Sequence, residues 1–264
     1  MQNPLKHPCI LTIAGSDSGA GAGIQADMKT AAALGCYATT AITAVTVQNT
    51  LGVTAVHTVP LDIIEKQIIS VLDDIGADAI KIGMLATPDI AKVVVKTLSK
   101  YSNIPVILDP VLVATSGDTL SNNETIDIIV NELMPMCAII TPNTHEANAI
   151  TNFADDKWEY LKNKGCNGLL LKGGHNEQNG IVTDVLFSNE GKFEFSSEFI
   201  VSENTHGTGC TLSSAIASYM ALGYNLSYSV ELAHDYVHHA IASAVEINMG
   251  KGHSPVHHFF KQWE

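Results

Sequence analysis

Short apolar runs rich in β-branched residues alternate along this chain with longer amphipathic or alanine-rich stretches, and this alternation limits the folds that the chain can adopt. The runs predict strands at residues 9–14, 37–47, 53–59, 79–82, 104–108, 138–140 and 168–171. The stretches between them predict helices over 24–34, over 60–76, from 88, over 124–131 and through most of 208–249. Strands joined by crossover helices predict an α/β fold, a three-layer sandwich whose mostly parallel central sheet has helices on both faces.

One pair of strands predicts a departure from parallel pairing. Residues 181–187 and 192–195 flank Ser188-Asn189-Glu190-Gly191, a turn sequence that favours a hairpin and therefore an antiparallel edge of the sheet. No internal repeat, low-complexity tract or Pro- and Ser-rich linker divides the sequence. We therefore expect residues 1–264 to form a single domain.

The net charge of the chain limits the classes of partner that it can bind. A formal net charge of -13, from 14 Lys and Arg against 27 Asp and Glu, would repel a nucleic-acid backbone and an anionic membrane. Any phosphate that binds must therefore be held by local groups. The sequence shows no apolar stretch of signal-peptide or membrane length, so we expect a cytoplasmic protein.

The five cysteines do not form a recognisable framework. They are widely spaced and odd in number, and none forms a Cys-x-x-Cys pair. This pattern favours neither a set of disulfides nor a structural zinc site. We expect four of them to pack as small hydrophobic residues, whereas Cys210 lies in a motif of its own.

That motif is a glycine turn, Gly207-Thr208-Gly209-Cys210, which precedes an expected helix over 212–222. Glycine lets the backbone approach a phosphate closely, and the start of a helix offers backbone N–H groups and a partial positive charge. The turn is suited to a transferring phosphoryl group. An ordinary helix cap is the alternative interpretation.

A second motif, Asn143-Thr144-His145-Glu146, follows the expected strand at 138–140. Asn143 and Glu146 are three residues apart and could face one side of a first helical turn, or they could form a capping pair. Together with the glycine turn, this Asn-x-x-Glu segment resembles the paired signature of the ribokinase family of sugar and vitamin kinases.

Within that family the sequence is similar, from residue 10 to about 223, to the branch of bacterial hydroxymethylpyrimidine/phosphomethylpyrimidine kinases. The matching segments are Ala14-Gly15-Ser16-Asp17-Ser18, Ala22-Gly23-Ile24-Gln25-Ala26-Asp27, Val47-Gln48-Asn49-Thr50, Lys81-Ile82-Gly83-Met84-Leu85, Asp109-Pro110-Val111, Leu171-Lys172-Gly173-Gly174-His175 and His206-Gly207-Thr208-Gly209-Cys210-Thr211. Gly19-Ala20-Gly21 departs from the branch, most members of which carry a second serine or glycine there.

The resemblance implies a ribokinase-like fold, a homodimer and a kinase that uses ATP and Mg²⁺ in thiamine biosynthesis. It would phosphorylate 4-amino-5-hydroxymethyl-2-methylpyrimidine to the monophosphate and then to the diphosphate. It also implies that the pyrimidine is bound by Gln48, Ala22, Asp27, Met84 and Val111. The carboxamide of Gln48 offers both a donor and an acceptor to a ring nitrogen and an amino group.

The remaining site residues are expected around ATP. Lys172, Asn143, Glu146 and Thr208 would bind the nucleotide, and Gly207, Thr208, Gly209 and Cys210 would act on the transferred group. Asp109 and Glu146 would organise Mg²⁺ through water, because hard divalent ions prefer oxygen ligands and keep much of their hydration. Capping or surface roles are the alternatives for these residues.

Cys210 occupies the place where ribokinase relatives carry an aspartate base. We expect the helix start to lower the pKa of its thiol below the usual value of about 8.5. We also hypothesise that a cysteine suits two acceptors, because a fixed carboxylate would repel the anionic phosphate that attacks in the second step. A silent buried thiol is the alternative.

Two rival functions stay open. A pyridoxal kinase of the same branch would also bind a flat heteroaromatic ring with a hydroxymethyl arm, although Gln48 favours the pyrimidine. A non-catalytic vitamin-binding or regulatory protein could keep the same fold. The glycine run at 19–23 does not match a dinucleotide fingerprint, and the paired histidines at 234, 238, 239, 257 and 258 are expected to be solvated rather than metal-bound.

Overall fold

The computed structural model describes residues 7–112, 123–174 and 177–263, and its centre is a nine-stranded sheet. The order across the sheet is β3-β2-β1-β4-β5-β6-β7-β8-β9. The strands are β1 (Cys9–Asp17), β2 (Tyr37–Asn49), β3 (Gly52–Thr58), β4 (Ala79–Ile82), β5 (Val106–Leu108), β6 (Ile139–Ile140), β7 (Gly168–Leu171), β8 (Ile181–Ser188) and β9 (Gly191–Glu198).

The six strands from β2 to β7 in this order are parallel, and antiparallel strands close both edges. The predicted hairpin is confirmed, because β8 and β9 pair antiparallel and β8 also lies antiparallel to β7. The other edge, where β3 pairs antiparallel with β2, was predicted as a strand without a direction.

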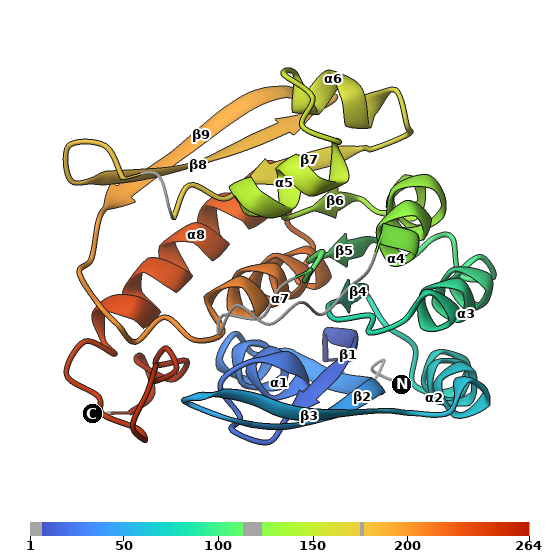
Figure 1. The fold of residues 1–264 in the computed structure, drawn as a ribbon, viewed down its shortest axis with the longest axis horizontal. Helices are drawn as coiled ribbons and strands as arrows, with labels where there is room; N and C mark the ends of the chain where they lie inside the picture. The colour runs from blue at the N-terminus through green and yellow to red at the C-terminus, as the bar shows by residue number, and fades with distance from the viewer. Residues whose placement is uncertain (1–6, 113–122, 175–176, 264) are drawn as a thin grey trace, which may run out of the picture.

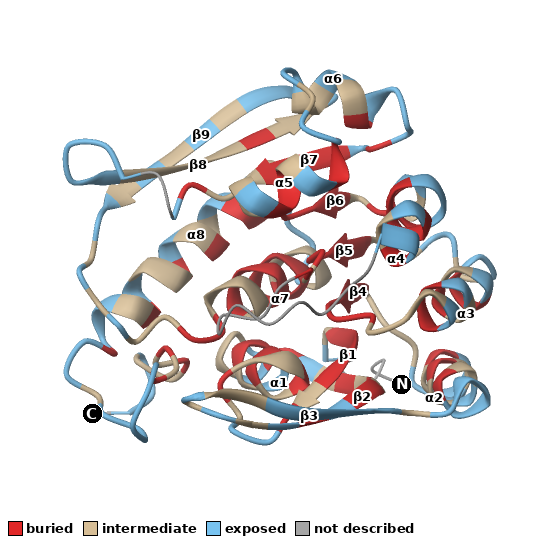
Figure 2. Ribbon diagram, viewed as in Figure 1, coloured by how far each residue is buried: buried red, intermediate tan, exposed pale blue. Residues whose placement is uncertain are grey.

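Helices cover the two faces of the sheet, as Figure 1 shows. One face carries α2 (Leu61–Asp74), α3 (Pro88–Leu98), α4 (Asn123–Ile128) and α6 (Lys157–Lys162), and the other carries α1 (Gly23–Ala33), α7 (Thr208–Ala221) and α8 (Leu226–Ala242). Each set packs a separate apolar cluster against the strands, so the buried residues lie between helix and sheet (Figure 2). The predicted three-layer α/β sandwich is confirmed.

Local signals in the sequence set several helix ends. Thr87 caps α3 by accepting a hydrogen bond from the Ile90 N–H at 3.3 Å, with Pro88 in the first turn. Gly76, with φ of +78°, follows α2 in the left-handed region that favours glycine. The helix expected over 124–131 is instead α4 followed by a π-helical turn at Ile129–Leu133, and α6 was not predicted because it is only six residues long.

The last predicted helical stretch is divided into α7 and α8, which are separated by Gly223 with φ of +93°. Another short helix, α5 (Thr144–Ile150), follows β6 directly. Among the residues that the structure describes, no helix combines the length and the apolar character needed to cross a bilayer.

Candidate active site

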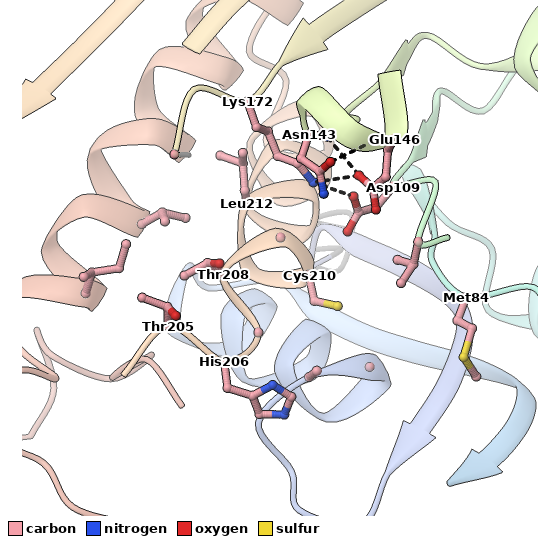
Figure 3. A pocket seen from close by; sticks show the side chains of 18 of the residues that line it. Met84, Asp109, Asn143, Glu146, Lys172, Thr205, His206, Thr208, Cys210 and Leu212 are labelled. Atoms are coloured by element: carbon pink, nitrogen blue, oxygen red, sulfur yellow. Dashed lines mark hydrogen bonds and ion pairs between the residues drawn. The ribbon is translucent and has the colours of Figure 1, made fainter. Parts of the chain in front are cut away.

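A cavity of about 770 Å³ lies where the carboxyl ends of the central strands meet the start of α7. Polar residues at the end of β1 and after β5, β6 and β7 line it, and α7 and α8 contribute to its wall. In open α/β sheets ligands bind at this edge of the strands. The cavity is therefore the candidate active site, and Figure 3 shows it from close by.

The glycine turn is the first turn of α7. Gly207 has φ of +84°, and a Cβ at this position would overlap the carbonyl of Gly21, so only glycine fits the close approach of the two loops. A Cβ on Gly209 would lie 3.3 Å from both Asp109 Oδ2 and Lys172 Nζ. The helix begins at Thr208, the first residue of the longer helical stretch predicted over 208–249, and this start places its N-terminal end at the cavity as anion binding requires.

A residue near the chain end braces this turn. The Thr211 hydroxyl donates to the Gly207 carbonyl at 2.8 Å and accepts from His258 Nε2 at 3.1 Å. His258 is buried, and Tyr236 Oη donates to its carbonyl at 2.6 Å. Burial, with the nearby charges of Lys29 and His257, lowers the pKa of His258 to about 3, so its ring is neutral. Nothing in the sequence pattern indicated this brace.

Lys172, which follows β7, forms a charged cluster with Asp109 and Glu146 in the cavity (Figure 3). We call this group the Lys172 cluster. The Lys172 ammonium lies 2.9 Å from Asp109 Oδ1 and 3.8 Å from Glu146 Oε2. Burial works against the ammonium, but Asp109 and Glu146 outweigh it and raise the pKa of Lys172. Burial raises the pKa of Glu146. The charge of Asp109 raises it further, whereas the charge of Lys172 acts to lower it.

Asn143 and Glu146 realise both of the interpretations that the sequence left open. Asn143 Oδ1 accepts from the Glu146 N–H at 2.9 Å, and Glu146 Oε2 accepts from the Asn143 N–H at 2.8 Å, so the two form a capping box on α5. The same two side chains line the cavity beside Lys172. The cap therefore fixes the carboxylate where it faces the cavity.

Four of the predicted pyrimidine contacts line the same cavity, namely Ala22, Gln48, Met84 and Val111. The Gln48 carboxamide accepts from Thr46 Oγ1 at 3.1 Å and lies 3.4 Å from His206 Nε2 through its nitrogen. His206 in turn contacts Asp17 Oδ2 at 3.0 Å.

Asp17 organises the glycine run that the sequence left without a clear role. Its carboxylate accepts N–H bonds from Gly19, Gly21 and Ala22 at 2.7, 3.0 and 2.9 Å. Burial works against the charged form, yet the hydrogen bonds from His206 and these backbone groups outweigh it and lower the pKa of Asp17. Asp17 and His206 were quoted in the family segments but were not predicted as site residues.

Asp27 is not where the sequence placed it. It does not line the cavity but lies on the sheet-facing side of α1, fully buried, and it contacts Lys81 Nζ at 2.8 and 3.0 Å. The Ser214 hydroxyl donates to it at 2.6 Å, and the Thr12 hydroxyl also donates to it. The expectation that Asp27 lines the pyrimidine pocket is wrong because its carboxylate is directed to a buried lysine.

Cys210 lines the cavity and is only partly buried, whereas Cys9, Cys36, Cys137 and Cys166 are buried, as expected for packing residues. The predicted lowering of its pKa is wrong. Burial raises the pKa of the Cys210 thiol to about 11, although Lys81 and the Gly23 N–H at the start of α1 act in the opposite direction. Loss of water outweighs the favourable charges, so the resting thiol is neutral.

Two of the histidines expected in solvent are removed from it, His258 fully and His234 partly. His234 Nδ1 contacts Asp184 Oδ2 at 2.9 Å within the cavity wall, and His258 is the brace described above. Within residues 7–112, 123–174 and 177–263, no group of three or more His, Cys, Asp or Glu side chains is placed to hold a metal ion. The motif residue His175 lies outside the described residues.

Comparison with known proteins gives a consistent result. The family model described as phosphomethylpyrimidine kinase matches residues 17–257. The hydroxymethylpyrimidine/phosphomethylpyrimidine kinase of Escherichia coli (strain K12) is 41% identical over 98% of this chain and 100% of its own length. A thiamine biosynthetic bifunctional enzyme of Arabidopsis thaliana is also 41% identical over 97% of this chain, which spans 51% of that enzyme.

A solved structure extends the comparison to a second activity. The pyridoxal kinase of Staphylococcus aureus, in complex with pyridoxal, is 29% identical and superposes with a TM-score of 0.86. The match covers 97% of this chain and 95% of that one. The fold and the arrangement of its elements are therefore shared with this pyridoxal kinase.

Proposed function

Because the chain belongs to the phosphomethylpyrimidine kinase family, we propose that it uses ATP to phosphorylate 4-amino-5-hydroxymethyl-2-methylpyrimidine and then the resulting monophosphate, for thiamine biosynthesis. One observation carries the proposal. The glycine turn of α7, the Lys172 cluster and the side chains of Gln48, Met84 and Val111 all line one cavity. Its volume, about 770 Å³, falls in the range of small-molecule sites.

The chemistry asks for positioning and charge neutralisation. An acceptor oxygen forms a bond to the γ-phosphorus of ATP while the bond to the β,γ-bridging oxygen breaks and ADP leaves. The Gly207–Cys210 turn would hold the transferring group at the α7 start. Lys172, with Asn143, Glu146 and Thr208, would bind the nucleotide, because the ammonium offsets phosphate charge in a cavity with several carboxylates.

Mg²⁺ would bind beside Lys172. Asp109 and Glu146 supply carboxylate oxygens, the donors that Mg²⁺ prefers, and both line the cavity. The negative charge of Asp109 repels that of Glu146 and so helps to raise the pKa of Glu146. A bound cation would relieve this repulsion. When bound, the ion would neutralise charge on the phosphates.

The role proposed for Cys210 rests on its neutral thiol. A thiol whose pKa lies near 11 adds no fixed negative charge where the second acceptor, a phosphate, must attack. In Cys210→Asp we expect the second phosphorylation to fall more than the first, when the two are measured separately. Cys210→Ala is the control, and equal losses in both steps for Cys210→Asp would contradict this role.

An assay of ADP release tests the function itself. We expect turnover with hydroxymethylpyrimidine and with its monophosphate, and little with no acceptor. Pyridoxal is the second candidate acceptor, since the superposed Staphylococcus aureus kinase is a pyridoxal kinase. Turnover with pyridoxal alone would favour that function. No turnover with any acceptor would favour a non-catalytic vitamin-binding protein.

We further propose that residues 1–264 act as one domain in the cytoplasm and that the kinase is a homodimer. The continuous nine-stranded sheet supports a single domain. Exposed apolar side chains on β2 and β3, among them Val45, Val47 and Val56, support contact with a second copy. Light scattering coupled to size-exclusion chromatography tests the assembly, and a monomeric mass at micromolar concentration would contradict the dimer.

A further inference from the structure

Lys81, which pairs with Asp27, is completely buried and has no role in the reaction as proposed above. Lys81 lies in β4, all four residues of which are buried. Its side chain and that of Asp27 have no exposed surface, and their N–O distances are 2.8 and 3.0 Å. Removing two charges from water is costly, and an apolar pair is often as stable. The fold alone therefore does not explain this ion pair.

The pair lies beside Cys210. Ser214, which donates to Asp27 Oδ1 at 2.6 Å, follows Cys210 by four residues on α7, so the two side chains share a helix face one turn apart. Lys81 and Cys210 both reach the wall of the same cavity. A Cβ on Gly83 would lie 2.9 Å from Lys81 Nζ, so a glycine at this position leaves room for the ammonium.

Charged groups from four elements act on the Cys210 sulfur. Lys81 from β4 attracts negative charge there, whereas Asp27 from α1 and Asp109 after β5 repel it. Lys172 after β7 also interacts with Cys210. The backbone N–H of Gly23, at the start of α1, contributes in the same direction as Lys81. Of the two lysines, Lys172 is the one that would bind ATP. Lys81 would then be the cation whose charge continues to act on the Cys210 sulfur when ATP is bound.

We propose that Lys81 is a positioning residue of the first phosphorylation: held by Asp27, its ammonium increases the minor fraction of Cys210 that is thiolate, the form that accepts the proton of the acceptor hydroxyl, while most of the thiol stays neutral. The inference rests on the proposed function. The proton moves from the hydroxymethyl oxygen to Sγ while that oxygen bonds to the γ-phosphorus and ADP leaves. The second acceptor is a phosphate, largely dianionic above a pKa of about 6, and has no such proton to lose.

The first experiment follows the sulfur without any substrate. Iodoacetamide alkylation of Cys210 is measured by mass spectrometry between pH 7 and 10 in the wild type and in Lys81→Met/Asp27→Asn. The double variant leaves no unpaired buried charge, and circular dichroism checks its fold. Because Lys81 acts on the sulfur more strongly than Asp27 does, we expect alkylation to be at least threefold slower at each pH below 9. Cys210→Ala reports labelling of the four buried cysteines, and Lys66→Met, in an exposed pair with Asp62, is the matched control.

Alkylation rates that coincide in the double variant and the wild type would overturn the proposal. The second experiment measures both phosphorylation steps in the same proteins. We expect the double variant to lose at least tenfold more kcat in the first step than in the second, with a first-step pH profile displaced to higher pH. Equal losses in both steps would also overturn it. A wild type that turns over neither acceptor refutes the proposed function, while the alkylation rates still decide whether Lys81 acts on the sulfur.

Discussion

Two lysine–aspartate pairs flank the start of α7, and they differ in what surrounds them. Lys81–Asp27 and Lys172–Asp109 have similar N–O distances of 2.8 and 2.9 Å. Both side chains of the first pair have no exposed surface, whereas Lys172 is 16% exposed and opens onto the cavity. The hydroxyls of Thr12 and Ser214 both donate to Asp27, while Lys172 is shared between Asp109 and Glu146.

The difference separates two uses of the same ion pair. A sealed pair keeps its partners, so it can supply only a fixed field to a neighbour such as Cys210. An open pair can exchange a carboxylate for a phosphate when the nucleotide enters, because both are anions at one ammonium. The surroundings of the pair, rather than the pair itself, decide whether the lysine acts through its electric field alone or binds a ligand directly.

Breaking the sealed pair is expected to have the largest effect. Lys81→Met leaves the Asp27 carboxylate buried without its cation, so we expect the free energy of unfolding to fall by about 3–5 kcal/mol. Urea denaturation measures this loss. In Lys81→Met/Asp27→Asn most of the stability should return, since no charge is left unpaired. A single variant as stable as the wild type would show that Asp27 does not need the lysine.

Breaking the open pair is expected to affect activity more than stability. Lys172→Met should lower kcat/KM by about 10²–10³ for both acceptors, because it removes a charge that faces the transferring group. The midpoint of thermal unfolding should change far less than in Lys81→Met. Lys192→Met removes a lysine from an exposed pair with Glu194 and is the matched control. Full activity in Lys172→Met would remove Lys172 from the proposed nucleotide site.

The open cluster should also make stability depend on pH. Burial raises the pKa of Glu146 above its ordinary value of 4.5, so the folded state holds this proton more tightly than the unfolded state. The contribution of Glu146 is therefore complete below about pH 4.5 and is lost as pH rises through its folded pKa. Urea titrations from pH 4 to 7 should show Glu146→Gln gaining stability relative to the wild type. A constant difference across this range would contradict the raised pKa.

The hydroxyls around the two aspartates give the smallest expected effect. Ser214→Ala removes a 2.6 Å hydrogen bond to Asp27 and should cost about 1–3 kcal/mol of unfolding free energy, because the acceptor is charged and sealed from water. Thr141→Val removes a 3.2 Å bond to Asp109 and should cost less, since that carboxylate borders the cavity. Equal losses in urea denaturation would show that the two environments do not differ in this respect.

The sequence predicted the layers because periodicity and caps are local signals. The strands alternate with helices that begin at recognisable residues such as Thr87, and each strand end delivers a polar residue such as Asp109 or Lys172. The sequence could not predict the direction of the Asp27 side chain, because a motif fixes its place on α1 but not its partner on β4. The pKa of Cys210 was missed for a related reason: burial depends on what packs around the thiol.

His258 affects the order in which the parts of the reaction centre form during synthesis. It follows Thr211 by 47 residues, yet it hydrogen-bonds to the hydroxyl of Thr211, which donates to the Gly207 carbonyl. During synthesis the glycine turn emerges from the ribosome well before its brace exists. The reaction centre therefore reaches its final form only after residue 258 has been synthesised, and a chain truncated before residue 258 retains every proposed site residue but lacks the support of the turn.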